Sequence, residues 1–206
     1  MVDSSSTHQP RIGFFGGSFD PIHNGHLSLA KQAILQADLE TLLLCPAYHA
    51  PLRPTKPFFE AEDRLGMLEK VAVEHPELKV FPHEISQQKV CFTYHTLLEV
   101  GKKYSQSEIF LLLGADQFSK LPQWKFIDEL VKLVTFLVFS RSSGMALTEP
   151  PLPEINFELM KNELIDLSST TIRQKIQSGQ SIRNDIPGPA YEYLENHNLL
   201  QHSPVS

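Results

Sequence analysis

One short stretch constrains the fold of this chain more than any other, the segment GSFDPIHNGHL at residues 17–27. It follows an apolar run at residues 12–15 and precedes a segment with helical periodicity. A strand that ends at the glycine pair Gly16 and Gly17 and turns directly into a helix explains this order. Backbone amides and the positive end of the helix dipole would meet at such a turn, where they attract phosphate. The segment therefore predicts a strand–turn–helix unit with an anion site at its corner.

The remaining chain alternates short apolar runs with amphipathic ones. This pattern predicts strands at residues 11–15, 41–45, 78–81, 108–113, 135–140 and 164–167, and helices at residues 25–37, 60–74, 93–104, 124–131, 170–178 and 189–197. Such alternation is typical of an α/β fold with a doubly wound, mainly parallel sheet, here with a small C-terminal helical segment. We expect one domain over residues 11–200, loops at residues 46–59 and 141–156, and flexible ends at residues 1–10 and 201–206.

Composition excludes several classes of protein. The net charge of −6 and the lack of a basic stripe argue against a nucleic-acid binder. No apolar run reaches the roughly 18 residues of a membrane span, and the first ten residues lack the apolar core of a signal peptide. The two cysteines, Cys45 and Cys91, have no CxxC partner, which favours a reducing cytoplasm. The sequence leaves a monomer and a homo-oligomer both open.

Two histidines three residues apart, His23 and His26, lie at the start of the first predicted helix. Their imidazoles could donate to charge that builds on a phosphorus centre. A metal pair would need a third ligand, and none has a recognisable spacing. The pair could also be merely exposed on the helix. Gly25 between them favours the phosphate interpretation, because a side chain there would crowd a bound phosphate.

A second segment, DLSSTTIR at residues 166–173, has the pattern of another helix start. Ser168, Ser169 and Thr170 are typical of an N-cap and first turn, where hydroxyls and free amides suit phosphate oxygens. Arg173, one turn later, could reach the same anion with a bidentate fork. The alternative is an ordinary capped helix with a surface arginine. Two such helix starts in one domain favour a polyphosphate site.

A third segment, GADQFSKLPQW at residues 114–124, follows a predicted strand. Gly114 permits close backbone approach, and Asp116 could accept a hydrogen bond from a ribose or an adenine. Trp124, the single tryptophan, could stack on an aromatic base or could simply pack in the core. There is no Walker A motif, no GxGxxG fingerprint and no GxSxG elbow, so P-loop, nicotinamide-dehydrogenase and serine-hydrolase chemistry have no support.

Together, GGSFDPIHNGHL and SSTTIR resemble the HxGH nucleotidyltransferase superfamily, over residues 12–200. GADQFSKLPQW and FTYHTL at residues 92–97 are most similar to the nicotinate-nucleotide adenylyltransferases. The resemblance implies a Rossmann-like nucleotidyltransferase fold. It also implies transfer of the adenylyl group of ATP to nicotinate mononucleotide, which gives deamido-NAD and pyrophosphate in NAD biosynthesis. Mg²⁺ would enter with ATP, without a metal site of the protein's own.

The resemblance also implies site residues. His23, His26 and Arg173 would be catalytic. ATP would contact ten further residues: Gly16, Gly17, Ser18, Phe19, Gly25, Gly114, Asp116, Ser168, Ser169 and Thr170. The mononucleotide would contact Arg53, Thr93 and Trp124.

Several positions depart from the family pattern. The proline-rich loop ends Ala50-Pro51-Leu52-Arg53 where the family has Pro-Pro-His-Lys, so Leu52 replaces the loop histidine while Arg53 keeps a cation. Gln87, Cys91 and His95 stand where arginine, serine and aspartate are usual. These departures concern mononucleotide binding. The acceptor could instead be nicotinamide mononucleotide or phosphopantetheine, or the chain could be a non-catalytic nucleotide sensor.

Overall fold

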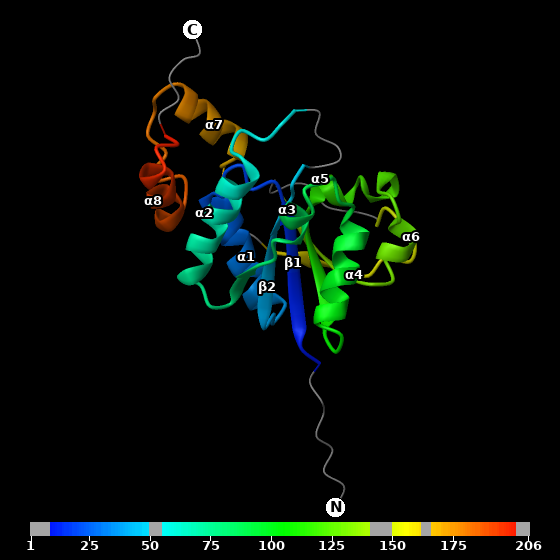
Figure 1. Cartoon of the computed structure of the whole chain (residues 1–206). Helices are drawn as coiled ribbons and strands as arrows, with labels where there is room; N and C mark the ends of the chain where they lie inside the picture. The colour runs from blue at the N-terminus through cyan, green and yellow to red at the C-terminus, as the bar shows by residue number, and fades with distance from the viewer. Residues whose placement is uncertain (1–8, 50–54, 141–149, 162–165, 201–206) are drawn as a thin grey trace, which may run out of the picture.

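The computed structural model describes residues 9–49, 55–140, 150–161 and 166–200. In those residues six strands form one sheet, in which every neighbouring pair is parallel and the order is β3-β2-β1-β4-β5-β6 (Figure 1). The doubly wound α/β fold is confirmed. The strands are β1 (Arg11–Gly17), β2 (Thr41–Pro46), β3 (Leu78–Val80), β4 (Glu108–Gly114), β5 (Thr135–Phe139) and β6 (Phe157–Met160).

The central strands are apolar on both faces because helices cover both faces of the sheet. Alternate residues of β2 show this: Leu42 and Leu44 belong to one core cluster, while Leu43 and Cys45 belong to the other. The first cluster lies under α1 (Asn24–Gln36), α2 (Ala61–Val73), α7 (Ser169–Gln177) and α8 (Gly188–Asn196). The second lies under α4 (Thr93–Lys103), α5 (Ala115–Phe118), the short 3₁₀ turn η1 (Leu121–Gln123) and α6 (Ile127–Leu130).

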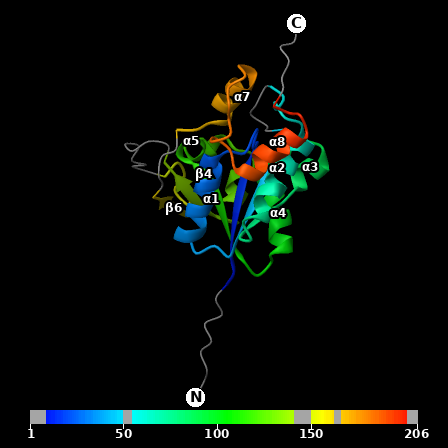
Figure 2. The same cartoon turned by 90° about the vertical axis from the view of Figure 1, so that its left-hand side faces the viewer.

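Figure 1 shows α1, α2 and α8 on one side of the strands and α4 on the other, and in Figure 2 the side with α1, α2 and α8 faces the viewer. The predicted C-terminal helical segment is confirmed as α8, which packs on α2. A further short helix, α3 (His83–Gln87), connects β3 to the α4 segment. No helix in the described part of the chain has the length and apolar character that a bilayer crossing requires.

The strand order creates a switch point between β1 and β4. Strands β1 and β4 are paired in the middle of the sheet, and the chain winds outward from them in opposite directions. In open α/β sheets, ligands bind beyond the carboxyl ends of the strands at such a point. Gly17 ends β1 and Gly114 ends β4, so two of the predicted site segments begin side by side there.

Two predicted elements were wrong. The sixth strand lies at Phe157–Met160 and not at residues 164–167, of which 164 and 165 are outside the described residues and 166 and 167 belong to no strand. This strand has one neighbour, and Glu158 and Leu159 are exposed, so it lacks the apolar run of a central strand. The helix predicted at residues 124–131 is only α6, because Phe126 has a left-handed backbone (φ 62°) that begins the helix there.

Candidate active site

The turn after β1 leads into α1 through the two histidines. His23 is the N-cap residue of α1, and its Nδ1 accepts a hydrogen bond from the backbone N–H of His26 at 3.3 Å. In return, Nδ1 of His26 accepts from the backbone N–H of His23 at 3.2 Å. The two rings are stacked, with centroids 3.7 Å apart, and His23 is only 7% exposed. The pair is therefore a reciprocal helix cap.

This cap decides which ring nitrogen of each histidine carries the hydrogen. Because both Nδ1 atoms accept backbone hydrogen bonds, each neutral imidazole carries its hydrogen on Nε2. The rings of Phe15 and Phe19 meet the His26 ring edge-on, at centroid distances of 5.9 and 5.1 Å, and hold it in place. The N-terminus of α1 thus carries two stacked imidazoles whose Nε2 atoms bear the hydrogen.

Asp20 fastens the turn to the loop before α2. Asp20 is 2% exposed, and its carboxylate accepts the backbone N–H groups of Phe58 and Phe59, each at 2.9 Å. Phe19, directly before it, has a left-handed backbone (φ 44°) and a buried ring. A conformation of this kind costs a non-glycine residue about 1–3 kcal/mol and persists only where its surroundings hold it.

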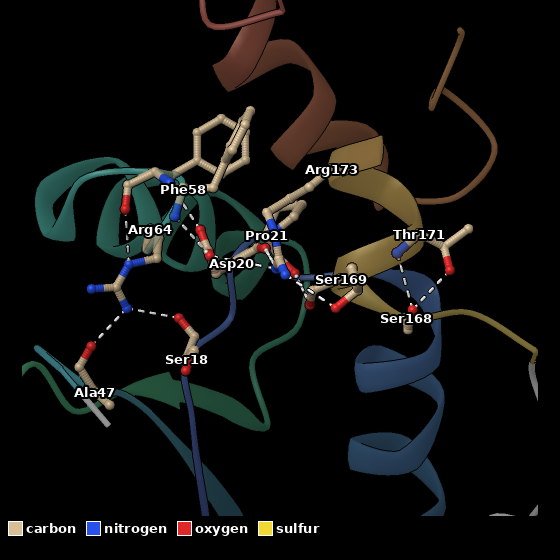
Figure 3. Close-up of polar contacts among 12 residues, drawn as sticks. Ser18, Asp20, Pro21, Ala47, Phe58, Arg64, Ser168, Ser169, Thr171 and Arg173 are labelled. Atoms are coloured by element: carbon tan, nitrogen blue, oxygen red, sulfur yellow. Dashed lines mark hydrogen bonds and ion pairs between the residues drawn. The ribbon is translucent and has the colours of Figure 1, made fainter. Parts of the chain in front are cut away.

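The second predicted helix start meets the same turn, as Figure 3 shows. Ser168 is the N-cap of α7, and its Oγ accepts from the backbone N–H of Thr171. Ser169 Oγ donates to the carbonyl of Pro21 at 3.0 Å. Arg173 Nη1 donates to the carbonyl of Asp20 at 2.7 Å and lies 3.5 Å from its carboxylate. The structure therefore places α7 against the turn that carries the two histidines.

Arg173 is held on its own helix as well. Its Nη2 donates to Oγ1 of Thr170 at 3.0 Å, and its side chain is 20% exposed. Gly179, with φ 69°, follows the C-terminus of α7, where a left-handed residue commonly ends a helix. The guanidinium is thus fixed in direction while part of it still faces solvent.

A pocket of about 160 Å³ opens beside this junction. Its lining combines the turn, the loop before α2 and α7, with the residues Ser18, Asp20, His49, Thr55, Lys56, Pro57, Phe58 and Arg173. The sequence analysis did not single out His49 or Lys56 as lining residues, or Asp20 as the residue that holds the loop before α2. The available signal was the proline-rich loop, whose polar residues His49 and Lys56 flank the family's usual His-Lys position. The predicted contact Arg53 lies outside the described residues.

The third predicted segment begins at the neighbouring strand. Gly114 ends β4 and is the N-cap of α5, and Asp116 lies in the first turn of that helix. Trp124 is partly buried and packs against the core cluster under α4 and α6. Its indole N–H is buried and has no hydrogen-bond partner among the described residues. The packing supports the core interpretation of Trp124, while the N–H leaves a donor for a ligand.

Thr93, the predicted mononucleotide contact, begins α4. The same helix contacts the buried carboxyl group of Glu84. Thr96 Oγ1 donates to Glu84 Oε1 at 2.8 Å, and this bond joins α3 to α4. Burial raises the pKa of Glu84, an effect that the hydrogen bond from Thr96 partly opposes. Burial and the nearby Glu84 also raise the pKa values of the Cys45 and Cys91 thiols. Neither cysteine has the environment of a reactive thiolate.

The raised pKa of Glu84 predicts a stability that depends on pH. The folded protein holds this proton more tightly than the unfolded chain, whose glutamates titrate near 4.5. Stability should therefore fall as the pH rises above 4.5 and the folded carboxyl loses its proton. Glu84→Gln should remove that part of the decline, which urea unfolding of both proteins at a series of pH values would measure. Equal slopes for the two proteins would contradict the prediction.

The other departures from the family pattern lie around α4. Gln87 is exposed at the end of α3, and Cys91 Sγ lies 3.6 Å from the carbonyl of Lys89. His95 is exposed on α4 and meets the ring of Phe126 edge-on, at a centroid distance of 4.8 Å. Leu52 is outside the described residues.

Comparison with known proteins identifies the family. Residues 14–175 match the family described as cytidylyltransferase-like. A probable nicotinate-nucleotide adenylyltransferase from Geobacillus thermodenitrificans is 34% identical over 92% of this chain and 85% of its own length. The chain belongs to the cytidylyltransferase-like family, among its nicotinate-nucleotide adenylyltransferases. A further member, from Lactiplantibacillus plantarum, is 33% identical over 93% of this chain and 88% of its own.

Solved structures show that the fold is shared as well. The nicotinic acid mononucleotide adenylyltransferase of Plasmodium falciparum, complexed with NaAD, has a TM-score of 0.74 at 19% identity, and the match covers 93% of this chain and 97% of that one. A nicotinate-nucleotide adenylyltransferase structure from Vibrio parahaemolyticus gives a TM-score of 0.65 at 17% identity. The family resemblance and the nucleotidyltransferase fold predicted from the sequence are thus confirmed.

Proposed function

We propose that this adenylyltransferase family member transfers the adenylyl group of ATP to nicotinate mononucleotide, giving deamido-NAD and pyrophosphate. One observation carries the proposal: the N-termini of α1 and α7 meet at a single turn, where Ser169 and Arg173 bind the carbonyls of Pro21 and Asp20. Two helix N-termini, two imidazole donors and a guanidinium converging on one corner suit a polyphosphate. The names of the related proteins support the choice of substrates.

The reaction needs positioning and charge stabilisation, and no nucleophile from the protein. The 5′-phosphate oxygen of the mononucleotide attacks the α-phosphorus of ATP in line, and pyrophosphate leaves. The Nε2–H groups of His23 and His26 donate to the transferring and leaving phosphates as their charge grows. Arg173 stabilises the pyrophosphate, and amides at residues 16–19 and hydroxyls at 168–170 hold the remaining oxygens. Gly114 and Asp116 contact the adenosine.

Magnesium fits this site as a companion of ATP. Among the described residues, no group of three or more His, Cys, Asp or Glu side chains is placed to hold a metal ion. The carboxylate of Asp20 is already committed to the amides of Phe58 and Phe59. We therefore place Mg²⁺ on the ATP phosphates, where it would neutralise charge, and its usual oxygen ligands would come from substrate and water.

A pyrophosphate-release assay with ATP and magnesium tests the proposal. The purified protein is offered nicotinate mononucleotide, nicotinamide mononucleotide or phosphopantetheine in separate reactions. We expect the highest kcat/KM with nicotinate mononucleotide. Preference for either other acceptor would reassign the substrate within the family. ATP binding without release from any acceptor would favour the nucleotide sensor.

Trp124 gives a test of the mononucleotide side. Stacking of an aromatic ring on a side chain contributes about 1–3 kcal/mol, so Trp124→Ala should raise the KM for the mononucleotide about 5- to 150-fold. The KM for ATP should change little, and Trp124→Phe should keep most of the effect of the ring. If Trp124→Ala lowers only the melting temperature, the indole is a core residue and not a substrate contact.

Location and assembly complete the proposal. Cys45 and Cys91 are free thiols, consistent with the reducing cytoplasm in which we place the protein. The proposed substrates are small nucleotides, and neither a nucleic acid nor a membrane is required. A homo-oligomer is compatible with the proposed site, which draws only on residues of one chain.

A further inference from the structure

A buried arginine lies directly beneath the turn that carries the proposed ATP contacts. Arg64 of α2 is 1% exposed, and its guanidinium binds main-chain carbonyls from three segments. Nη1 donates to Ser18 and to Ala47, each at 2.7 Å (Figure 3). Nη2 donates to Tyr48 at 3.1 Å, and Nε donates to Phe59 at 3.3 Å. One cation thus joins the ends of β1 and β2 to the N-terminus of α2.

Burying a guanidinium is expensive, and general core packing does not require it. Moving such a charge out of water costs several kcal/mol, which hydrogen bonds must offset. Arg64 occupies the face of α2 that also carries Met67, Leu68 and Val71, all at most 1% exposed, where an apolar residue would serve a core. The cost of burying Arg64 therefore indicates that its bonds to these carbonyls have a function besides core packing.

The consequence follows from peptide geometry at Ser18. In a planar trans peptide the carbonyl and the following N–H point in opposite directions. Arg64 draws the Ser18 carbonyl toward α2, so the N–H of Phe19 is directed away from Arg64. Phe19 has the strained left-handed backbone described above (φ 44°), so the direction of its N–H depends on such restraints.

The other side of the turn is fixed in the same manner. Arg173 holds the carbonyl of Asp20 at 2.7 Å, and two amides of the loop before α2 hold its carboxylate. The peptide between Ser18 and Phe19 is therefore bracketed by an arginine on each side of the chain. A donor fixed before the substrate arrives needs no reorganisation during the reaction.

We propose that Arg64 is a positioning residue for adenylyl transfer: it orients the Ser18–Phe19 peptide so that the N–H of Phe19 donates to a phosphate oxygen of ATP. This inference rests on the proposed function. It goes beyond a stabilising role for Arg64, because it assigns the orientation of one donor to this side chain. A lysine could keep the charge, but its single nitrogen cannot replace the planar fork whose three nitrogens reach the three segments.

The dipeptide Ser-Phe occurs once in the sequence, at residues 18 and 19, which allows a direct test in the wild-type protein. Labelling serine carbonyls with ¹³C and phenylalanine amides with ¹⁵N selects the Phe19 amide in an NMR spectrum. Adding magnesium-ATP without acceptor should shift this resonance. If ATP shifts other phenylalanine amides in the ¹⁵N spectrum and leaves Phe19 unchanged, the inference is overturned while the proposed function stands. If ATP shifts no amide, the proposed function itself fails.

Variants test the role of the guanidinium. Arg64→Lys should lower kcat about 10²-fold, the loss expected for one misdirected donor, and should abolish the ATP-induced shift of Phe19. Arg11→Ala is the matched control, since Arg11 is at the opposite end of β1, paired with Glu108 and Glu158. It should lower stability and leave kcat unchanged. A folded Arg64→Lys protein with wild-type kcat would overturn the proposal, and if the variant does not fold, the wild-type NMR experiment decides.

Discussion

Replacing His23 with asparagine is expected to lower kcat for adenylyl transfer by about 10²–10³-fold while the protein stays folded. His23 has two functions in the structure. Its Nδ1 caps α1, and its Nε2–H is the donor proposed for the phosphates. Asparagine is a good N-cap, so it keeps the first function and loses the directed imidazole donor. Steady-state kinetics with ATP and nicotinate mononucleotide, together with a melting curve, measure the two separately.

Two further variants divide the effect. His23→Ala should lose both the cap and the donor, and cap removal should cost about 1 kcal/mol of stability beyond the asparagine variant. His26→Ala should also lower kcat by about 10²–10³-fold, because the stacked ring supplies the second Nε2–H. Near-normal turnover of folded His23→Asn protein would remove this imidazole from the mechanism.

The parts of the site that the sequence could predict are those with local causes. The caps of α1 and α7 form between residues three apart, His23 with His26 and Ser168 with Thr171, so their spacing is legible in the sequence. The glycine pair at the end of β1 and Gly179 after α7 are local as well. The alternation of strands and helices predicted the doubly wound parallel sheet, whereas the strand order that puts the switch point between β1 and β4 is known from the structure.

The contacts that assemble the site are distant in sequence and had no local signal. Ser169 and Pro21 are 148 residues apart, and Arg173 and Asp20 are 153 apart. Their meeting was inferred from family resemblance and from the number of helix starts, and the carbonyl acceptors could not be foreseen. Arg64 did have a signal in the sequence. A charged residue at helical spacing from Met67, Leu68 and Val71 lies on the buried face of its helix, and a buried charge must have hydrogen-bond partners. This signal does not identify the groups that the arginine binds.

The errors in secondary structure have the same physical origin. In the described part of the chain β6 is the edge strand beside β5, and Glu158 and Leu159 are exposed, so its sequence is not a continuous apolar run. At α6, the helical pattern of residues 124–131 is interrupted by the left-handed backbone of Phe126. The ring of Phe126 packs against Phe92, Tyr94 and His95 of another segment. Tertiary packing of this kind overrides the local preference.

Arg173→Ala should lower kcat by about 10²–10³-fold and weaken inhibition by pyrophosphate. The structure gives two reasons. The guanidinium lines the pocket with Ser18 and Lys56, where the leaving phosphates would lie, and it also holds the carbonyl of Asp20. Arg173→Lys should recover part of the charge but not the fork that spans Asp20 and Thr170, so its kcat should fall between wild type and alanine.

Removing any positive charge could weaken nucleotide binding through the field of the whole protein, so a matched loss of charge is needed for comparison. Arg183 is exposed, lies over the ring of Tyr191 on α8 and is not among the residues that line the pocket. Arg183→Ala removes the same charge and should leave kcat and the inhibition constant for pyrophosphate within about 2-fold of wild type, because an exposed charge is screened by salt. If both alanine variants lose activity equally, Arg173 acts through net charge alone. If only Arg173→Ala does, and added salt leaves the difference between the variants in place, the loss belongs to the fork that Arg173 presents beside the turn.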